Sequence, residues 1–399
     1  MIKTFLLSEI AEIDPRNKPL LDSDELVDFA GMSNMSTEHG KLINFEKRKF
    51  SSVKKGYTSF KKNDILVAKL ENCFANSKIG EANISTKDGY GSTEFYVIRP
   101  NNELVHNRYL VHYLKQEKII FEGIQKVKGS VLKRVPKYFL ETLKIKLPPI
   151  PEQKKIAKIL DNSANIEVKI NKKMKLIKDL ECSIFNESFE INNLPSDNKI
   201  VTINDLVLNQ KSSIRTGPFG SQLLKSEFKN SGIKVVGIDN AVENEFKWTN
   251  KRYISKEKFK SLSRFQVHPN DVVITIMGTC GRVCIIPEDI GIAINTKHLC
   301  AITLDHNKCL PEFLRAYFLY SKKAKHHLRA RTKGAIMDGL NMGIIKTIPI
   351  EIPSIEDQKK FRSKVKKLNH LKINFQKQII SFCSMRSSIS SQFFTGTKK

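Results

Sequence analysis

The sequence lacks the features of an exported or membrane-embedded chain. It contains no run of about 18 apolar residues, the length that a transmembrane helix needs. The sequence does not begin with a charged segment followed by an apolar one, so we expect no secretory leader. Its seven cysteines are scattered and odd in number, a pattern typical of free thiols in a reducing compartment. We therefore expect no membrane partner and a cytoplasmic location.

Motifs of several nucleic-acid enzymes are also missing. The sequence has no Asn-Pro-Pro or Asp-Pro-Pro, the motif with which an adenine methyltransferase holds its flipped base. It has no Gly-x-x-x-x-Gly-Lys-[Ser/Thr] loop to cradle a nucleotide phosphate. Glu152-Gln-Lys154 resembles the Glu-x-Lys of metal-dependent nucleases, but it opens a predicted helix, where Glu152 stabilises the helix dipole. We expect no catalytic residue and no cofactor in this chain.

Two clusters of possible ligands argue weakly for a metal or catalytic site. Cys280, Cys284, His298 and Cys300 do not have the spacing of a zinc site, and buried thiols are the commoner reading. The adjacent His326 and His327 point in different directions on a helix, so phosphate contact or solvation is favoured over catalysis. The sequence predicts no metal site.

What the sequence has in excess is positive charge. Lysine and arginine number 68 against 41 acidic residues, which gives a formal net charge of +27. Residues 355–399 alone carry 11 basic and 2 acidic side chains. An excess of this size favours a polyanionic partner, and nucleic acid is the first candidate.

The chain also contains an internal repeat with an offset near 205 residues. The segment 147–155, Leu-Pro-Pro-Ile-Pro-Glu-Gln-Lys-Lys, matches 352–360, Ile-Pro-Ser-Ile-Glu-Asp-Gln-Lys-Lys. Shorter matches precede it in the same order: Lys128-Gly-Ser130 with Lys333-Gly-Ala335, and Asn63-Asp64 with Asn270-Asp271. Ordered matches with a slowly drifting offset indicate a duplicated fold with loop insertions.

A long polar segment with a heptad apolar stripe follows each Pro-rich signal. A period of 3.5 over about four heptads, without Gly or Pro inside, predicts a coiled-coil helix. Pro151 with Glu152, and Ser354 with Asp357, mark the two helix starts. The residues expected to pack between the helices are Ile156, Ile159, Ile166, Ile170, Ile177, Leu180 and Ile184, and Phe361, Leu368, Leu371, Phe375, Phe382, Met385 and Ile389.

The remaining segments predict two α+β domains. Short apolar runs bounded by Gly, Asn and Pro indicate strands near 64–68, 95–98, 271–276 and 299–303, with helices near 106–120 and 311–328. We expect a first domain over 1–147, a helix over 148–190, a linker over 191–199, a second domain over 200–351 and a second helix over 352–399.

This organisation resembles the specificity subunit of Type I restriction-modification systems. The most specific marks are Leu147-Pro-Pro-Ile-Pro-Glu-Gln-Lys-Lys-Ile156, Gln392-Phe-Phe-Thr-Gly396 and the loop Arg215-Thr-Gly-Pro-Phe-Gly-Ser-Gln-Leu223, which the first domain lacks. The resemblance implies a prokaryotic, non-catalytic subunit with two tandem target-recognition domains, whose two helices pair as an antiparallel coiled coil. It also implies double-stranded DNA, two methyltransferase subunits and a restriction (nuclease-translocase) subunit as partners, with S-adenosylmethionine bound by the methyltransferase.

Helix length supports a divided DNA target. A helix of about 35 residues spans roughly 50 Å, whereas one turn of B-DNA spans about 34–36 Å. Because the reading loops of the two copies differ, we expect an asymmetric bipartite site rather than a palindrome. The alternatives are a single-chain methyltransferase or nuclease, and a stand-alone DNA-binding scaffold or repressor.

Basic, amide and hydroxyl side chains in loops are the expected DNA contacts, because such groups meet phosphates and base edges. The two Lys-Gly-Ser/Ala loops are the strongest candidates, since each joins a glycine to flanking cations; the alternative is a solvated charged loop. The candidates are Lys69, Asn72, Lys126, Lys128, Ser130, Lys133 and Arg134 in the first domain, and Arg215, Ser221, Gln222, Lys297, Arg329, Arg331, Lys333 and Asn341 in the second.

Overall fold

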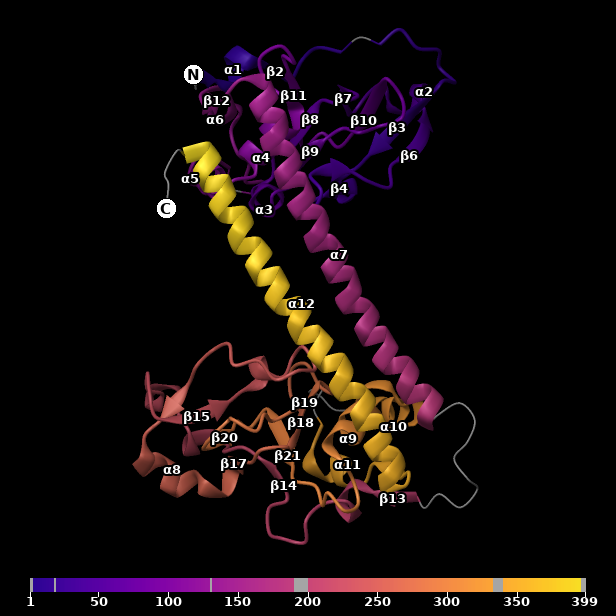
Figure 1. The fold of residues 1–399 in the computed structure, drawn as a ribbon, viewed down its shortest axis with the longest axis vertical. Coiled ribbons are helices and arrows are strands. Elements are labelled where there is room, and N and C mark those ends of the chain that lie inside the picture. Colours follow the sequence, from indigo (N-terminus) through magenta and orange to yellow (C-terminus); the bar gives the residue numbers. More distant parts are fainter. Residues whose placement is uncertain (1–2, 18, 130, 190–199, 333–339, 396–399) are drawn as a thin grey trace. The chain divides into compact units, whose positions relative to one another are not determined.

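The computed structural model describes residues 3–17, 19–129, 131–189, 200–332 and 340–395 (Figure 1). The chain divides into two compact units. Unit 1 consists of Met1–Lys173 and Phe375–Lys399, and unit 2 of Met174–Asn374. Within the described ranges, no helix is both long and apolar enough to cross a membrane. The predicted linker 191–199 lies outside the described residues.

Unit 1 contains a mixed α+β domain built on two sheets and a terminal strand pair. The larger sheet has the order β2 (Ala11–Ile13), β11 (Phe95–Pro100), β8 (Ile65–Ala68), β9 (Ile79–Glu81), β5 (Lys41–Leu42) and β4 (Met35–Ser36). The smaller sheet has the order β6 (Glu46–Lys49), β3 (Leu26–Ala30), β10 (Asp88–Gly91) and β7 (Thr58–Lys61). The first strand, β1 (Lys3–Leu6), pairs antiparallel with β12 (Lys144–Leu147).

The main core of unit 1 lies between the larger sheet, several helices and the start of the long helix. Leu110, Ile156 and Leu160 belong to one buried cluster with the strand residues Ile65 and Val67. The helices are α1 (Leu7–Ile10), α2 (Phe50–Val53), α3 (Glu71–Ala75), α4 (Asn107–Leu114), α5 (Glu117–Gln125), α6 (Lys137–Glu141) and the long α7 (Ile150–Phe189), which continues into unit 2.

Unit 2 repeats this plan. Its sheets have the orders β14 (Ile214–Thr216), β21 (Leu299–Ile302), β18 (Val272–Thr275), β19 (Val283–Ile285), and β16 (Tyr253–Ile254), β15 (Ile233–Val236), β20 (Ala293–Asn295), β17 (Gln266–Val267). Strand β13 (Ile200–Thr202) pairs antiparallel with β22 (Pro349–Glu351). The helices are α8 (Lys256–Leu262), α9 (Pro311–Tyr320), α10 (Lys322–Thr332), α11 (Met342–Lys346) and the long α12 (Ile355–Thr395), which continues into unit 1.

The duplication predicted from sequence is visible in the topology of the two units. Each smaller sheet contains one parallel pair, β3 with β10 and β15 with β20. In both copies an asparagine with positive φ, Asn63 or Asn270, precedes a buried aspartate. Asp64 accepts from Arg99, and Asp271 accepts from Arg215. The predicted fold class, two α+β domains each followed by a long helix, is confirmed.

Two expected helices are each divided in the structure. The region near 106–120 forms α4 and α5, and the region near 311–328 forms α9 and α10. Gln116 and Ser321 have extended backbone angles, with ψ of 138° and 129°, so one helix ends and the next begins there. The apolar periodicity continues across both breaks, which explains why the sequence pattern did not show them.

A buried glutamine joins each domain to the start of its long helix. The Gln153 side chain accepts from the backbone N–H of His106 at 2.8 Å and donates to the carbonyls of Leu104 and Pro148. Gln358 repeats the arrangement, accepting from the N–H of Leu310 at 2.8 Å and donating to the carbonyls of Lys308 and Pro353. Both side chains are at most 1% exposed.

The two long helices contact each other antiparallel within unit 1. Arg386 of α12 forms an ion pair with Glu167 of α7 at 2.6 Å. Further along, the Lys173 ammonium lies 5.4 Å from the ring centroid of Phe375. As the residue number rises along α7 from 167 to 173, the residue number of its partner on α12 falls from 386 to 375, so the helices run antiparallel. In unit 2, Phe185 and Phe189 of α7 pack on Phe361 of α12, with ring centroids 6.0 and 5.4 Å apart.

The predicted packing stripe is only partly buried. Ile156, Ile170, Phe361 and Leu368 are buried, and Ile159, Ile166, Ile177, Ile184, Phe375, Phe382 and Ile389 are half-buried. Leu180, Leu371 and Met385 were expected to pack but are 48%, 48% and 46% exposed. The helix ends turn a different face toward the domains, so that Leu160 and Phe185 are buried instead. A heptad pattern predicts contacts between helices and therefore does not predict this packing against the domains.

We predict that Gln153→Ala destabilises the protein. The substitution leaves one backbone N–H and two carbonyls, buried or part-buried, without their side-chain partner, at a cost of about 2–4 kcal/mol in the free energy of unfolding. Gln358→Ala should have a similar effect, and urea denaturation followed by circular dichroism measures both. The exposed neighbour provides the control, because Lys154→Ala should change stability by less than about 0.5 kcal/mol. A Gln153→Ala protein as stable as the control would disprove the anchoring role.

Candidate nucleic-acid interface

The described candidate DNA-contacting residues of unit 1 come from two neighbouring segments. The loop 126–134 is closed by two backbone hydrogen bonds between Lys128 and Arg134, of 3.0 and 2.9 Å. The N–H of Val135 donates to the carbonyl of Lys69, and the N–H of Glu71 donates to the carbonyl of Lys133. These bonds fix the loop beside the segment that carries Lys69 and Asn72.

The exposure of these candidates separates surface cations from structural ones. Asn72, Lys126, Lys128 and Lys133 are exposed, whereas Ser130 lies outside the described residues. Lys69 is half-buried, donates to the carbonyl of Thr93 at 2.8 Å and lies 5.0 Å from the Tyr96 ring centroid.

Arg134 has a specific partner within unit 1. Its guanidinium donates to both carboxylate oxygens of Glu94, at 2.8 and 2.6 Å. This pairing lowers the pKa of the Glu94 carboxyl below its ordinary value. A bidentate pair of this kind favours a role for Arg134 in positioning the loop.

The loop tip carries two apolar side chains that sequence reasoning missed. Val131 is 91% exposed and Leu132 is 55% exposed, although cations flank them. Gly129, at φ 113°, permits the turn, because a Cβ there would lie 2.5 Å from the Leu132 carbonyl oxygen. The repeat could have pointed to them. Two apolar residues follow the Lys-Gly-Ser/Ala motif in both copies, Val131-Leu132 in the first and Ile336-Met337 in the second.

Arg215 is the candidate whose environment departs most from the expectation. Its side chain is 6% exposed and forms an ion pair with Asp271, which is fully buried. It also donates to the carbonyls of Gln266 and Ser212 and to the Thr303 hydroxyl. This burial favours a structural role for Arg215 over the predicted DNA contact, because the guanidinium has its donors engaged inside the fold.

Ser221, Gln222 and Lys297 are exposed in unit 2. Ser221 and Gln222 lie on a 3-10 turn over Gly220–Gln222. Gly217 brings this loop against the chain before Lys297, because a Cβ at Gly217 would lie 2.3 Å from the carbonyl carbon of Thr296. The structure therefore places two non-contiguous candidate segments side by side.

Of the remaining candidates, Asn341 has a structural role and Arg329 lies at a cavity. The Asn341 side chain caps α11 by accepting from the N–H of Ile344 at 2.9 Å. Arg329 lines a cavity of about 570 Å³ with the turn Gly278–Gly281, Arg282 and Lys325. Sequence reasoning missed Arg282 and Lys325. Lys333 lies outside the described residues, as does the side chain of Arg331.

Cys284 and Cys300 of unit 2 are buried thiols. Burial raises the pKa of the Cys284 and Cys300 thiols to about 12, which opposes the thiolate form that metals bind. Cys280 is partly exposed. Among the described residues, no group of three or more His, Cys, Asp or Glu side chains could hold a metal ion.

Comparison with known families finds one that spans both copies. Residues 2–180 and 195–381 match the family described as the Type I restriction modification DNA specificity domain. The chain is 36% identical over 152 residues to the EcoAI specificity subunit of Escherichia coli, and this alignment covers 38% of this chain and 26% of that protein. It is 24% identical over 326 residues to the MjaVIII specificity subunit of Methanocaldococcus jannaschii, covering 77% and 73%.

A solved structure has the same fold. The S subunit of a Type I restriction-modification system from M. genitalium aligns with a TM-score of 0.58 at 15% identity, covering 99% of this chain and 96% of that one. At this level of identity the likeness extends to the fold. The match to the E. coli relative spans only about a quarter of that protein's length.

We predict that Arg215→Ala destabilises unit 2 rather than weakening DNA binding specifically. Removing the guanidinium leaves Asp271 as a buried carboxylate without its charge partner, at a cost of about 3–5 kcal/mol in the free energy of unfolding. Arg329→Ala is the matched control at an exposed position and should change stability by less than about 0.5 kcal/mol. Chemical denaturation distinguishes the two. If the Arg215→Ala protein kept full stability but lost DNA affinity, the result would contradict this prediction and support Arg215 as a DNA contact.

Proposed function

Because the chain belongs to the Type I restriction-modification DNA specificity domain family, we propose that it reads the DNA target for such a system and catalyses no reaction itself. In this proposal the α+β domains of units 1 and 2 each bind duplex DNA, in the cytoplasm of a prokaryotic cell. The net charge of +27 supports a polyanionic partner.

The observation that carries this proposal is the repeated attachment of two domains with different surfaces. Gln153 and Gln358 make equivalent bonds at equivalent positions. The two domains differ elsewhere in sequence, because the loop over Arg215–Leu223 of the second domain has no counterpart in the first. Two domains that are attached to their helices in the same way but differ in their loops suit a bipartite target whose halves differ in sequence.

We further propose that the long helices bind two methyltransferase subunits and that a restriction subunit joins the complex. S-adenosylmethionine would then be the cofactor of the methyltransferase partner. Large apolar side chains exposed on both helices support a protein partner, because exposed apolar area marks interaction surfaces. They include Leu176 (56%), Leu180 (48%), Ile373 (49%) and Ile380 (69%).

Methylome sequencing of the host, with and without this gene, tests the bipartite target. We expect gene-dependent adenine methylation at a motif of two short, dissimilar half-sites separated by an unread gap. A single continuous or palindromic motif would contradict the two-reader arrangement. Gene-independent methylation would contradict the function itself.

We predict that charging the exposed apolar surface of α7 abolishes co-purification with the methyltransferase. The double variant Leu176→Asp and Leu180→Asp places two carboxylates in the proposed interface, where burying them without partners is costly. Affinity purification of the tagged chain, co-expressed with the methyltransferase, measures the loss. Ile292→Asp introduces a charge at a similarly exposed apolar residue, 51% accessible, outside the helices and should retain the partner. Equal recovery of the partner by all proteins would exclude α7 as the docking surface.

A further inference from the structure

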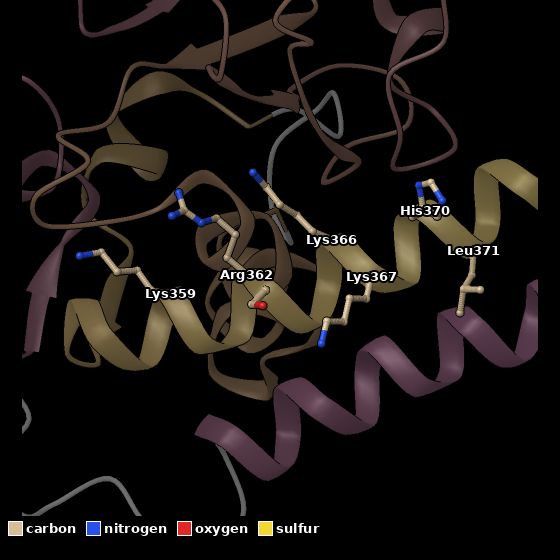
Figure 2. Close-up of a pocket in the computed structure, with 7 residues that line it drawn as sticks. Lys359, Arg362, Lys366, Lys367, His370 and Leu371 are labelled. Carbon is tan, nitrogen blue, oxygen red and sulfur yellow. The ribbon is translucent and has the colours of Figure 1, made fainter.

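One face of α12 carries a run of exposed cations that the reading domains do not account for. Lys359, Lys366, Lys367 and His370 are exposed and Arg362 is half-buried. Together with Ser363 and Leu371 they line an open groove of about 750 Å³, and all seven residues lie on α12 within unit 2 (Figure 2). We name Lys359, Arg362, Lys366 and Lys367 the α12 basic strip.

The cations of the strip are not neutralised within the fold. Among the described residues, none of the four lies within 4.0 Å of a carboxylate, whereas their neighbour Lys360 pairs with Asp357 at 2.9 Å. The surrounding sequence does not compensate, since residues 355–399 contain 11 basic and 2 acidic side chains. Like charges at helical spacing destabilise a helix, so an uncompensated strip points to an external anion.

The geometry of the helix separates this strip from its packed face. Phe361, Val365 and Leu368 are buried, at 1%, 2% and 8% exposure, and recur at the spacing of one helix face. Lys359 and Lys366 lie on the opposite face, and Figure 2 shows Lys359, Arg362 and Lys366 extending to the same side of α12. Between Lys359 and Lys367 the strip extends about 12 Å along the helix axis, roughly a third of a turn of B-DNA.

The composition of this face favours nucleic acid over a protein partner. Protein interfaces depend on aromatic or aliphatic anchors at their centre and are depleted in lysine. From 359 to 370 the groove presents only Lys, Arg, Ser and His, and the exposed Leu371 stands at its end. Lysine, arginine and serine side chains are common donors to phosphate oxygens.

We propose that the α12 basic strip binds the phosphate backbone of duplex DNA without reading its sequence. This proposal rests on the proposed function, in which the chain binds DNA through its α+β domains. It adds a contact that lies on a long helix and outside the reading loops. The strip would contribute equally to the affinity for target and non-target duplexes, because phosphates carry no sequence information.

The experiment compares the salt dependence of DNA binding by the full-length chain and by a strip variant. The variant carries Lys359→Gln, Arg362→Gln, Lys366→Gln and Lys367→Gln, which retain helix propensity and alter only exposed or half-buried positions. Each lost phosphate contact should reduce the slope of log affinity against log salt by about 0.9, so the slope should fall by up to about 3.6. The reduction should be the same for a random-sequence duplex and for a duplex with the methylated motif.

A second variant of equal charge controls for the general loss of cations. Lys155→Gln, Lys158→Gln, Lys169→Gln and Lys172→Gln remove four exposed lysines of α7 and should leave the slope within about one contact of the wild type. An equal fall in both variants would overturn the proposal, because the effect would then be one of net charge.

Two further outcomes also decide the matter. A strip variant with the wild-type slope overturns the proposal, and if it has lost its methyltransferase partner as well, the strip is a protein-binding surface. If the wild-type chain and its methyltransferase complex bind no duplex, the proposed function fails first. Failure of the inference is thereby distinguished from failure of the function, since only the latter abolishes wild-type binding.

Discussion

The attachment of each domain to a helix start through one buried glutamine is the constraint on which the other features depend. An amide that accepts one hydrogen bond and donates two is satisfied in a narrow range of orientations. Gln153 and Gln358 therefore fix the rotation of each domain about its helix as well as its position. A reader of DNA needs such fixed geometry, because base edges are recognised by directional bonds in a groove.

The end of each long helix packs on the domain of the other repeat copy, so each domain has a core that includes residues from both copies. Phe394, near the end of α12, packs on Tyr109 and Tyr113 of α4, with ring centroids 5.2 Å apart in both cases. Phe189, its counterpart 205 residues earlier, packs on Phe313 of α9 at 5.1 Å. Each unit thus contains the start of one long helix and the end of the other. Folding of each domain is coupled to the helix that follows the other domain.

The fold could be predicted from sequence where periodicity and repetition carried the information. Both long helices and the duplicated domains followed from the heptad stripe and the offset near 205. Other features depend on tertiary partners that no local pattern specifies. Gln153 stood in the recognised motif, yet its role required knowing that the 104–106 segment would meet it. Likewise, Arg215 belongs to a loop similar to one common in the recognition domains of this family, but its ion pair with Asp271, 56 positions away, keeps it inside the fold.

Arginine and lysine have different roles in this chain, although sequence reasoning treated their charge alike. Arginines such as Arg99, Arg108, Arg134, Arg215 and Arg315 donate to carboxylates within the fold. Their planar guanidinium suits bidentate bonds, whereas the strongly hydrated ammonium of lysine is less costly to leave at the surface. Much of the surface charge therefore comes from lysine, and in the proposed function these lysines would supply salt-sensitive affinity for phosphates without selecting a sequence.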